Sequence, residues 1–259
     1  MTKFTGLVLA LTVALGLLFV SATWAQETQG WYMEEYLETI APADMPTRNG
    51  IIKTWYGAGK LKKDSFGQEV LIFRPDTKET FLLHPASRTY AVLPIEHMRM
   101  MAERSLAAYD SITSNPTAKP GDIYHITGRT KKIGAWNCQE IELKVQTVTA
   151  PGVTSRTTWW ITNEAGVGPE LLINIFRASM GDTKSPGIHK LFDAIATLDG
   201  FPVRQQTVTD AQGQKVTTTL TMHMIKKQKF DLSVFSVPEG YKRSHMPGPA
   251  SPGMKKMPE

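Results

Sequence analysis

Apolar and polar residues alternate through most of the chain. In Cys138–Val145, Ile141 and Leu143 would face one side of a strand, and the charged residues between them the other. Val216–Met224 alternates in the same way, with Met222 and Met224 on one face. A period of two is typical of antiparallel strands with one wet face. With flanking turn residues, it also predicts strands over Trp31–Ile40, Ile51–Tyr56, Leu61–Phe66, Glu69–Arg74, Thr80–His84, Thr89–Leu93, Ile123–Gly128, Arg156–Thr162 and Pro202–Thr209.

Three segments have the spacing of amphipathic helices. Pro94–Asp110 and Pro169–Met180 each begin with a proline, which is common in the first helical turn, and Gly181 ends the second. Ile188–Gly200 has apolar residues along one face and ends at a glycine. Helices with one apolar stripe and strands with one apolar face bury both by packing together. We therefore predict an α+β fold in which about ten antiparallel strands curl and helices cover the concave face.

The adjacent residues Trp159 and Trp160 lie in a predicted strand and must point to opposite faces. Trp159, which shares a face with Ile161, is expected on the side covered by the helices. Trp160 is expected on the outer face among threonine and arginine side chains. There it would either pack across the strands, as aromatic residues do on sheets, or contact a ligand or partner.

The first 25 residues predict export. Lys3 precedes the apolar run Gly6–Val20, and small residues lead to Ala25. This is typical of a secretory signal peptide cleaved before Gln26, although an uncleaved membrane anchor is the alternative. We expect a periplasmic protein with one domain over residues 26–242. Residues 243–259 are basic and rich in Pro and Gly, so we expect a disordered tail that is either solvated or in peripheral contact with an anionic membrane.

The positive charge of the chain is concentrated in the C-terminal tail and in three short clusters. The formal charge of +5 belongs mostly to the tail, so nucleic acid is not an expected partner of the nearly neutral body. Three basic clusters are predicted at turns or strand ends: Lys60–Lys63, Arg129–Lys132 and Lys226–Lys229. If they gather on one rim, they could bind lipid head groups or an acidic partner. Otherwise they are solvated strand ends that resist edge pairing.

Residues that commonly carry catalysis are not grouped in this sequence. Cys138 is the one cysteine, so no intrachain disulfide can form, and its apolar strand predicts a buried, inert thiol. The six histidines lack metal-ligand spacing, and no nucleophile motif is present. Glu34, Glu35 and Glu38 are expected on a solvated strand face. We therefore predict a protein that is not an enzyme and has no metal or cofactor.

Several segments in order resemble a known family. They are "LIFRPDTKETFLLHPASRTYAVLP" (Leu71–Pro94), "GRTKKIGAWNCQEIEL" (Gly128–Leu143), "LDGFPVRQQ" (Leu198–Gln206) and "FDLSVFSVPEGYK" (Phe230–Lys242). Following a signal peptide, they are similar to a periplasmic family of unknown function with LolA/LolB-like character. The resemblance covers most of Trp31–Lys242. It implies a half-barrel with helices on its concave side and a cavity that binds acyl chains, as in lipoprotein carriers.

Two functions follow from this resemblance and the residue pattern. The first is binding of a lipid, an acylated protein or another apolar ligand between sheet and helices. The second is a cell-envelope protein-interaction module with a filled core and no ligand. For the first, the predicted ligand-lining residues are Met98, Leu106, Trp159, Ile175, Phe176, Leu191 and Phe192. A cavity of roughly 300 Å³ or more would distinguish the two.

Overall fold

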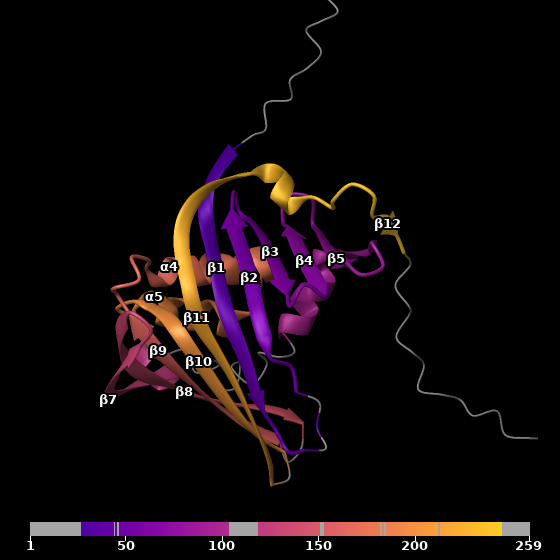
Figure 1. Ribbon diagram of the computed structural model, residues 1–259. Helices are drawn as coiled ribbons and strands as arrows, with labels where there is room; N and C mark the ends of the chain where they lie inside the picture. Colours follow the sequence, from indigo (N-terminus) through magenta and orange to yellow (C-terminus); the bar gives the residue numbers. More distant parts are fainter. Residues whose placement is uncertain are drawn as a thin grey trace, which may run out of the picture.

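A twelve-stranded sheet dominates the protein (Figure 1). The computed structural model describes residues 27–43, 45, 47–103, 119–150, 153–181, 183, 185–211 and 213–244. The strands are β1 (Glu27–Ile40), β2 (Gly50–Gly57), β3 (Lys60–Ser65), β4 (Glu69–Arg74), β5 (Glu79–His84), β6 (Thr89–Pro94), β7 (Tyr124–Ile133), β8 (Trp136–Ala150), β9 (Val153–Thr162), β10 (Phe201–Ala211), β11 (Gln214–Asp231) and β12 (Lys242–Arg243). The helical segments are residues 95–103, α3 (Pro120–Ile123), α4 (Pro169–Met180), α5 (Pro186–Ala196) and the 3-10 turn η1 (Leu232–Phe235).

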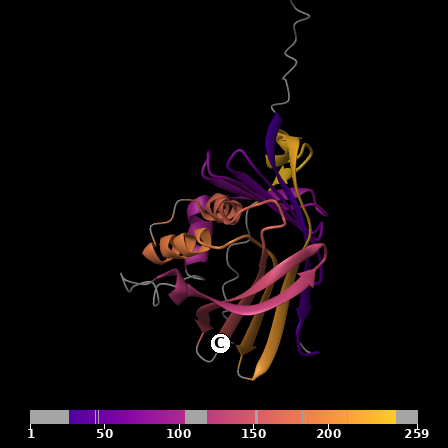
Figure 2. The same cartoon turned by 90° about the vertical axis from the view of Figure 1, so that its left-hand side faces the viewer.

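The strand order across the sheet is β12-β6-β5-β4-β3-β2-β1-β11-β10-β9-β8-β7. All neighbours are antiparallel except β12 and β6, which are parallel. The two edge strands, β12 and β7, do not pair with each other, so the sheet is open. It is strongly curved, and α4 and α5 lie on its inner side (Figure 2). The predicted α+β architecture of a curled antiparallel sheet with helices is therefore present.

The inner side of β8 and β9 packs against α5. Ile141 and Trp159 share a closed apolar cluster with Leu191, Phe192 and other α5 residues. Ser185 caps this helix because its side-chain oxygen accepts a hydrogen bond from the Ile188 amide at 3.3 Å. This end of the molecule has a filled core.

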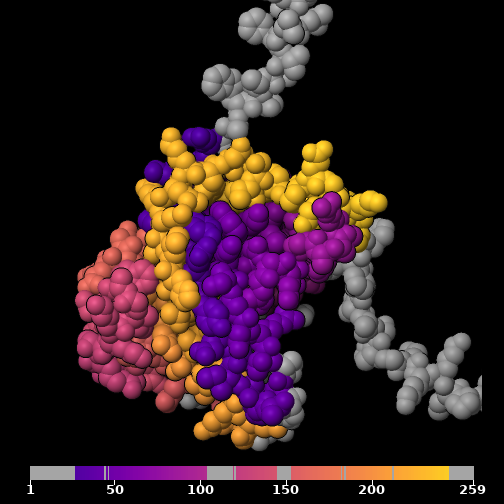
Figure 3. Space-filling view, viewed as in Figure 1, coloured from indigo at the N-terminus to yellow at the C-terminus, as the bar shows by residue number. Residues whose placement is uncertain are grey.

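The outer face of β4 and β5 is covered by the C-terminal segment. Ile72 and Leu83 pack with Phe235 of η1, and all three side chains are almost fully buried. Figure 3 shows this segment, in yellow, crossing the upper end of the outer face. It then joins the sheet as β12, where the Lys242 amide donates to the Arg88 carbonyl at 2.9 Å. The sheet is thus covered on both sides at this end.

Trp159 and Trp160 belong to different clusters. Trp159 is 5% exposed among the residues that pack on α5, as predicted. Trp160 is half-buried and packs against a second cluster that includes Phe201 and Val203. Its neighbours on the adjoining strands are Glu140 and Arg204. The two adjacent indoles therefore point to opposite faces of β9, and each packs against apolar residues of the protein.

Several element boundaries differ from the sequence predictions. The three basic clusters lie at the ends of strands β3, β7 and β11, as predicted, although cross-strand pairing continues through them. The helix predicted over Pro94–Asp110 is helical over residues 95–103, and its remainder lies outside the described residues. Arg243, predicted as the first residue of the tail, lies in β12. The segments 1–26 and 245–259, with the predicted signal peptide and most of the tail, also lie outside the described residues.

Candidate ligand cavity

A cavity of about 440 Å³ lies between α4 and the inner face of the sheet. Its walls come from both halves of the sheet, on strands β1 to β4 and β10 to β11, and from one side of α4. Most of its lining is apolar. The lining residues are Met33, Glu35, Thr54, Leu61, Lys63, Leu71, Phe73, Leu172, Ile175, Phe176, Ser179, Phe201, Pro202, Val203, Arg204, Gln205, Leu220 and Met222.

Helix α4 is buried on several sides at once. Its sequence is apolar around most of its circumference, which is typical of a helix inside a core. Leu171 and Ile173 pack into two separate clusters of the filled core. The third side, with Leu172, Ile175 and Phe176, faces the cavity and is only half-buried. The cavity therefore exists because one apolar side of α4 has no complementary sheet residues to fill it.

Strand alternation positions the sheet side of the cavity. On β11, Leu220 and Met222 point inward and line it. The β1–β11 register then shifts between Glu34 and Glu35, a bulge that changes the alternation along β11. Met224 is consequently 40% exposed, whereas Met222 is 4% exposed. The prediction that both methionines share one face was wrong because the bulge inserts an extra residue.

A glycine corner shapes the wall at β10. Gly200 has φ +134°, and a Cβ there would lie 2.5 Å from the carbonyl of Thr162. Only glycine tolerates both the backbone conformation and this close approach. Directly after it, the β9–β10 register shifts between Pro202 and Arg204. The corner and the irregularity bring Phe201 and Val203 to the cavity wall.

The residues predicted to line a ligand site occupy different places. Ile175 and Phe176 line the cavity, whereas Trp159, Leu191 and Phe192 lie in the filled core beside it. Met98 packs next to Ile175 in a small cluster with Leu61, Phe73 and Ala178. Leu106 lies outside the described residues. Ligand contact by any of these side chains stays a prediction.

Three charged residues that were not among the predicted ligand-lining residues lie on the cavity wall: Glu35, Lys63 and Arg204. Glu35 was expected on a solvated face together with Glu34 and Glu38. That expectation was wrong because adjacent strand residues point to opposite faces, and Glu35 shares its face with Met33. The sequence itself indicates this inward orientation, because Glu35 alternates with the apolar residues Met33 and Leu37 on the same strand face.

Burial governs the chemistry of the Glu35 carboxyl group. Removal from water raises the pKa of Glu35, and the nearby Lys63 ammonium lowers it by a smaller effect. Arg204 also lines the cavity, but cross-strand pairing sets it beside Trp160 and Thr221. Thr221 alternates with the inward residues Leu220 and Met222, so the side chain of Arg204 belongs to the outer row. Lys63 is thus the cation that faces Glu35.

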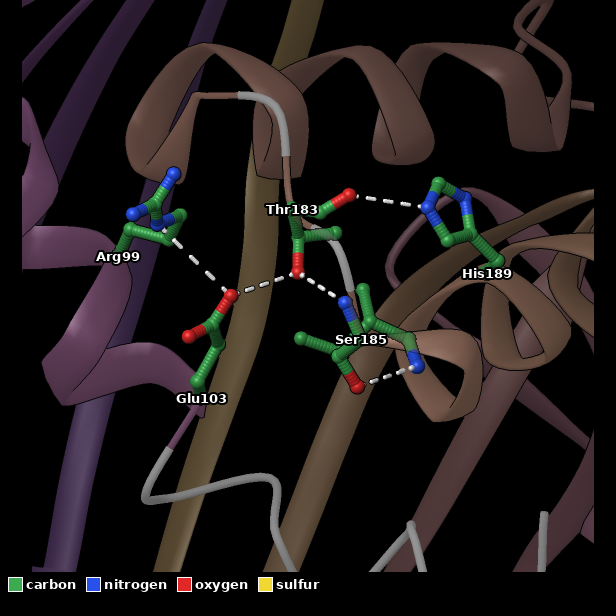
Figure 4. A network of polar contacts seen from close by, with 6 residues as sticks. Arg99, Glu103, Thr183, Ser185 and His189 are labelled. Atoms are coloured by element: carbon green, nitrogen blue, oxygen red, sulfur yellow. Dashed lines mark hydrogen bonds and ion pairs between the residues drawn. The ribbon is translucent and has the colours of Figure 1, made fainter. Parts of the chain in front are cut away.

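A polar network joins the helix of residues 95–103 to the link between α4 and α5 (Figure 4). The Thr183 hydroxyl donates to a carboxylate oxygen of Glu103 at 2.9 Å and accepts from the Ser185 amide at 3.1 Å. Glu103 is also 3.8 Å from Arg99, and a ring nitrogen of His189 lies 2.9 Å from the Thr183 carbonyl oxygen. The network fixes the Thr183 hydroxyl between the Glu103 carboxylate and the Ser185 amide. Its effect is to hold the three helices together at one end of α4.

Two other hollows are more polar than the cavity. One, of about 380 Å³, is lined by Lys78, Glu96, Arg99 and Arg177 among others. A shallower one, of about 610 Å³, lies over the start of β8 and includes Cys138, whose side chain is 2% exposed. Burial raises the pKa of the Cys138 thiol, so the predicted buried thiol is confirmed.

Within the described part of the chain, no group of histidine, cysteine or carboxylate side chains could hold a metal ion. None of the helices described there is both long and apolar enough to cross a membrane.

Comparison with known families identifies the chain. Residues 58–241 match the model of a family described as "Domain of unknown function (DUF4412)". The protein belongs to this family. The matched range begins in the β2–β3 turn and ends just before β12, so it includes α4 and most of the cavity wall. No curated protein sequence has significant similarity to the chain.

Some solved structures have a distant structural likeness to this DUF4412 protein. A LolA superfamily protein from Nitrosomonas europaea is 9% identical, with a TM-score of 0.30 over 80% of this chain and 90% of the other. A DUF1329 family protein from Desulfovibrio piger is 9% identical, with a TM-score of 0.26 over 84% and 90% of the two chains. The predicted membership of a family of unknown function is confirmed by the family match, and a LolA superfamily structure is among those with a distant likeness. Nothing about a ligand follows from likeness of this extent.

Proposed function

We propose that this protein binds an apolar ligand, such as a lipid or an acylated protein, between α4 and the sheet. The observation that carries the proposal is the cavity of about 440 Å³ with its largely apolar lining. Small-molecule sites commonly have volumes of about 300–1,000 Å³ and an apolar wall with a few polar groups. The cavity meets both criteria.

The role is binding and not catalysis. Among the described residues that line the cavity there is no histidine or cysteine, and Glu35 is the one carboxylate. The Ser179 hydroxyl donates to the Phe176 carbonyl oxygen at 2.8 Å, as helical serines often do. A pair of nucleophile and base is therefore missing from this wall. Glu35 and Lys63 serve better as recognition groups.

The protein acts in the periplasm. The support is the sequence pattern of residues 1–25, which is typical of a cleaved export signal. Its expected partners are a lipid or lipoprotein and another envelope protein, while the basic tail would give peripheral membrane contact. Nucleic acid is not an expected partner because the body is nearly neutral.

The alternative is an envelope interaction module without a ligand. The observation that favours it is the filled core around α5, where Trp159, Leu191 and Phe192 close the space completely. If the α4 side also closes around its own side chains in solution, no ligand would enter. A binding experiment therefore distinguishes the two functions.

The test fills the cavity by one substitution. Leu220→Trp enlarges a half-buried side chain on the cavity wall, and Thr221→Trp places the same indole on the opposite face of β11. The apolar dye N-phenyl-1-naphthylamine should bind the unaltered protein. Leu220→Trp should weaken its binding roughly tenfold or more, because each 1.4 kcal/mol of lost contact is tenfold in affinity.

Thr221→Trp is the matched control and should bind the dye as the unaltered protein does. Circular dichroism establishes that both variants stay folded. Equal dye affinity in all three proteins, or no dye binding at all, would remove the support for a ligand in this cavity.

A further inference from the structure

Glu35 and Lys63 come to the cavity from two different strands. Glu35 lies on β1 and Lys63 on β3, with β2 between them. Thr54 of β2 is directly opposite Lys63 and lines the same wall. The two charged side chains are therefore diagonal neighbours across three strands. Around them the wall is formed by Met33, Leu61 and other apolar residues.

The two charges approach each other without forming an ion pair. No ion pair or side-chain hydrogen bond of Glu35 or Lys63 occurs among the described residues, although Lys63 is near enough to affect the Glu35 carboxyl group. Charged groups in apolar surroundings cost stability unless they are paired. A diagonal, unbridged pair inside a cavity leaves room for a third polar group between its members.

The charge of this pair favours an anion. Lys63 carries a positive charge at neutral pH, whereas burial makes Glu35 retain its proton more readily than an exposed glutamate. When Glu35 is protonated, the inner wall carries the single positive charge of Lys63. A cationic head group would meet repulsion from Lys63, and an anionic one would meet an ammonium and a carboxylic acid that can both donate hydrogen bonds.

We propose that the ligand is a single-chain amphiphile with an anionic oxygen head group, a carboxylate or a phosphate, which binds between Lys63 and Glu35. This inference rests on the proposed function, because the chain of the amphiphile occupies the apolar part of the cavity beside Ile175 and Phe176. The volume of about 440 Å³ is at the lower end of the usual range and suits one chain.

Binding of the anion is coupled to protonation of Glu35. The head group and an ionised Glu35 repel each other, so the bound state favours the carboxylic acid. Affinity for the anion should therefore fall as pH rises through the pKa of Glu35, which lies above the ordinary glutamate value. The other charged groups near this wall are Lys63, whose ammonium opposes the shift, and the outward-facing Arg204.

The experiment compares ligands with one chain and different head groups. Palmitate, hexadecyl phosphate, hexadecanol and hexadecylamine compete with N-phenyl-1-naphthylamine for the purified protein at pH 7. At least one of the two acids should bind about tenfold or more tightly than hexadecanol, because the alcohol cannot accept a charge-assisted hydrogen bond from Lys63. Hexadecylamine should bind more weakly than the alcohol. The tighter of palmitate and hexadecyl phosphate identifies the head group.

Variants then assign the preference to the pair. Lys63→Met should abolish the advantage of the acid over the alcohol, while binding of hexadecanol persists. Lys63→Arg should restore most of that advantage. Lys53→Met is the matched control, since Lys53 is an exposed lysine on the outer face of β2, and it should leave the preference unchanged.

The pH arm uses hexadecanesulfonate, whose head group stays ionised throughout. Its affinity should decrease from pH 5 to pH 9 in the unaltered protein and should vary little in Glu35→Gln. If all four ligands bind equally, or Lys63→Met keeps the preference, the anionic head group is refuted although the cavity still binds apolar chains. If none of the ligands displaces the dye and none binds by calorimetry, the proposed function itself fails.

Discussion

At the scale of single residues, Glu35 is the least expected feature of this protein. Its neighbours Glu34 and Glu38 point outward from the same strand, and the Glu34 carboxylate accepts a hydrogen bond from the Tyr32 hydroxyl. Burial, and to a smaller extent this hydrogen bond, raise the pKa of Tyr32 to about 12. Glu35 has no such partner among the described residues and points into an apolar cavity. A carboxyl group in that position reduces folding stability whenever it ionises.

Glu35→Gln should therefore stabilise the protein in a pH-dependent way. The pKa of Glu35 is raised in the folded state, so the folded protein holds a proton that the unfolded chain releases first. Below the ordinary glutamate pKa the substitution should change little. As pH rises from that value through the raised one, the free energy of unfolding of the variant should increasingly exceed that of the unaltered protein.

Urea unfolding at pH 4 and pH 8 measures this difference. Glu38→Gln, at an exposed position of the same strand, is the control and should show no such growth with pH. An equal gain in the free energy of unfolding for Glu35→Gln at both pH values would mean that burial does not raise the pKa of the Glu35 carboxyl group.

At the scale of elements, alternation and turn chemistry were sufficient for most of the sheet. Each segment predicted as a strand forms one, and α4 begins at the predicted Pro169. Helix α5 begins at Pro186, two residues before the predicted start at Ile188. The strand β12 could not be predicted from Lys242 and Arg243 alone. It exists because the Lys242 and Ser244 amides donate to carbonyl groups of Arg88 and Tyr90, residues distant in sequence.

The turn η1 stabilises the outer face of the sheet. Asp231 caps it, because its carboxylate accepts a hydrogen bond from the Ser233 amide at 2.7 Å. Phe235 is 1% exposed and packs against Ile72 and Leu83. Its ring lies edge to face with that of Phe230, with 5.6 Å between the ring centroids. Phe230 in turn lies over Gly30 and Gly57, where a Cβ would clash with its ring.

Phe235→Ala should cost about 3–5 kcal/mol in the free energy of unfolding, as is usual for a fully buried phenylalanine. Ser233→Ala removes an exposed side chain from the same turn and should stay within about 0.5 kcal/mol. Urea unfolding monitored by circular dichroism measures both. Similar small losses for the two variants would contradict the role of η1 as a cover for the sheet.

At the scale of the whole molecule, the cavity results from the way α4 sits inside the curve of the sheet. The sequence predicted that Ile175 and Phe176 face inward, because both lie on one apolar stripe. It could not distinguish them from Leu191 and Phe192, which have the same pattern on α5 but are enclosed by the strands β8 and β9. Whether a stripe meets complementary side chains or an empty space depends on contacts between distant strands, which no local pattern contains.

The central claim is that an apolar ligand lies between α4 and the sheet. Photo-crosslinking tests it most directly: a palmitate analogue with a diazirine at the chain end is bound, irradiated and mapped by peptide mass spectrometry. The label should appear in peptides from α4 (Pro169–Met180) and from the inner positions of β1, β3 or β11, and excess palmitate should compete with it. Label confined to α5 or to the outer face beside η1, or no competed label at all, would contradict the claim.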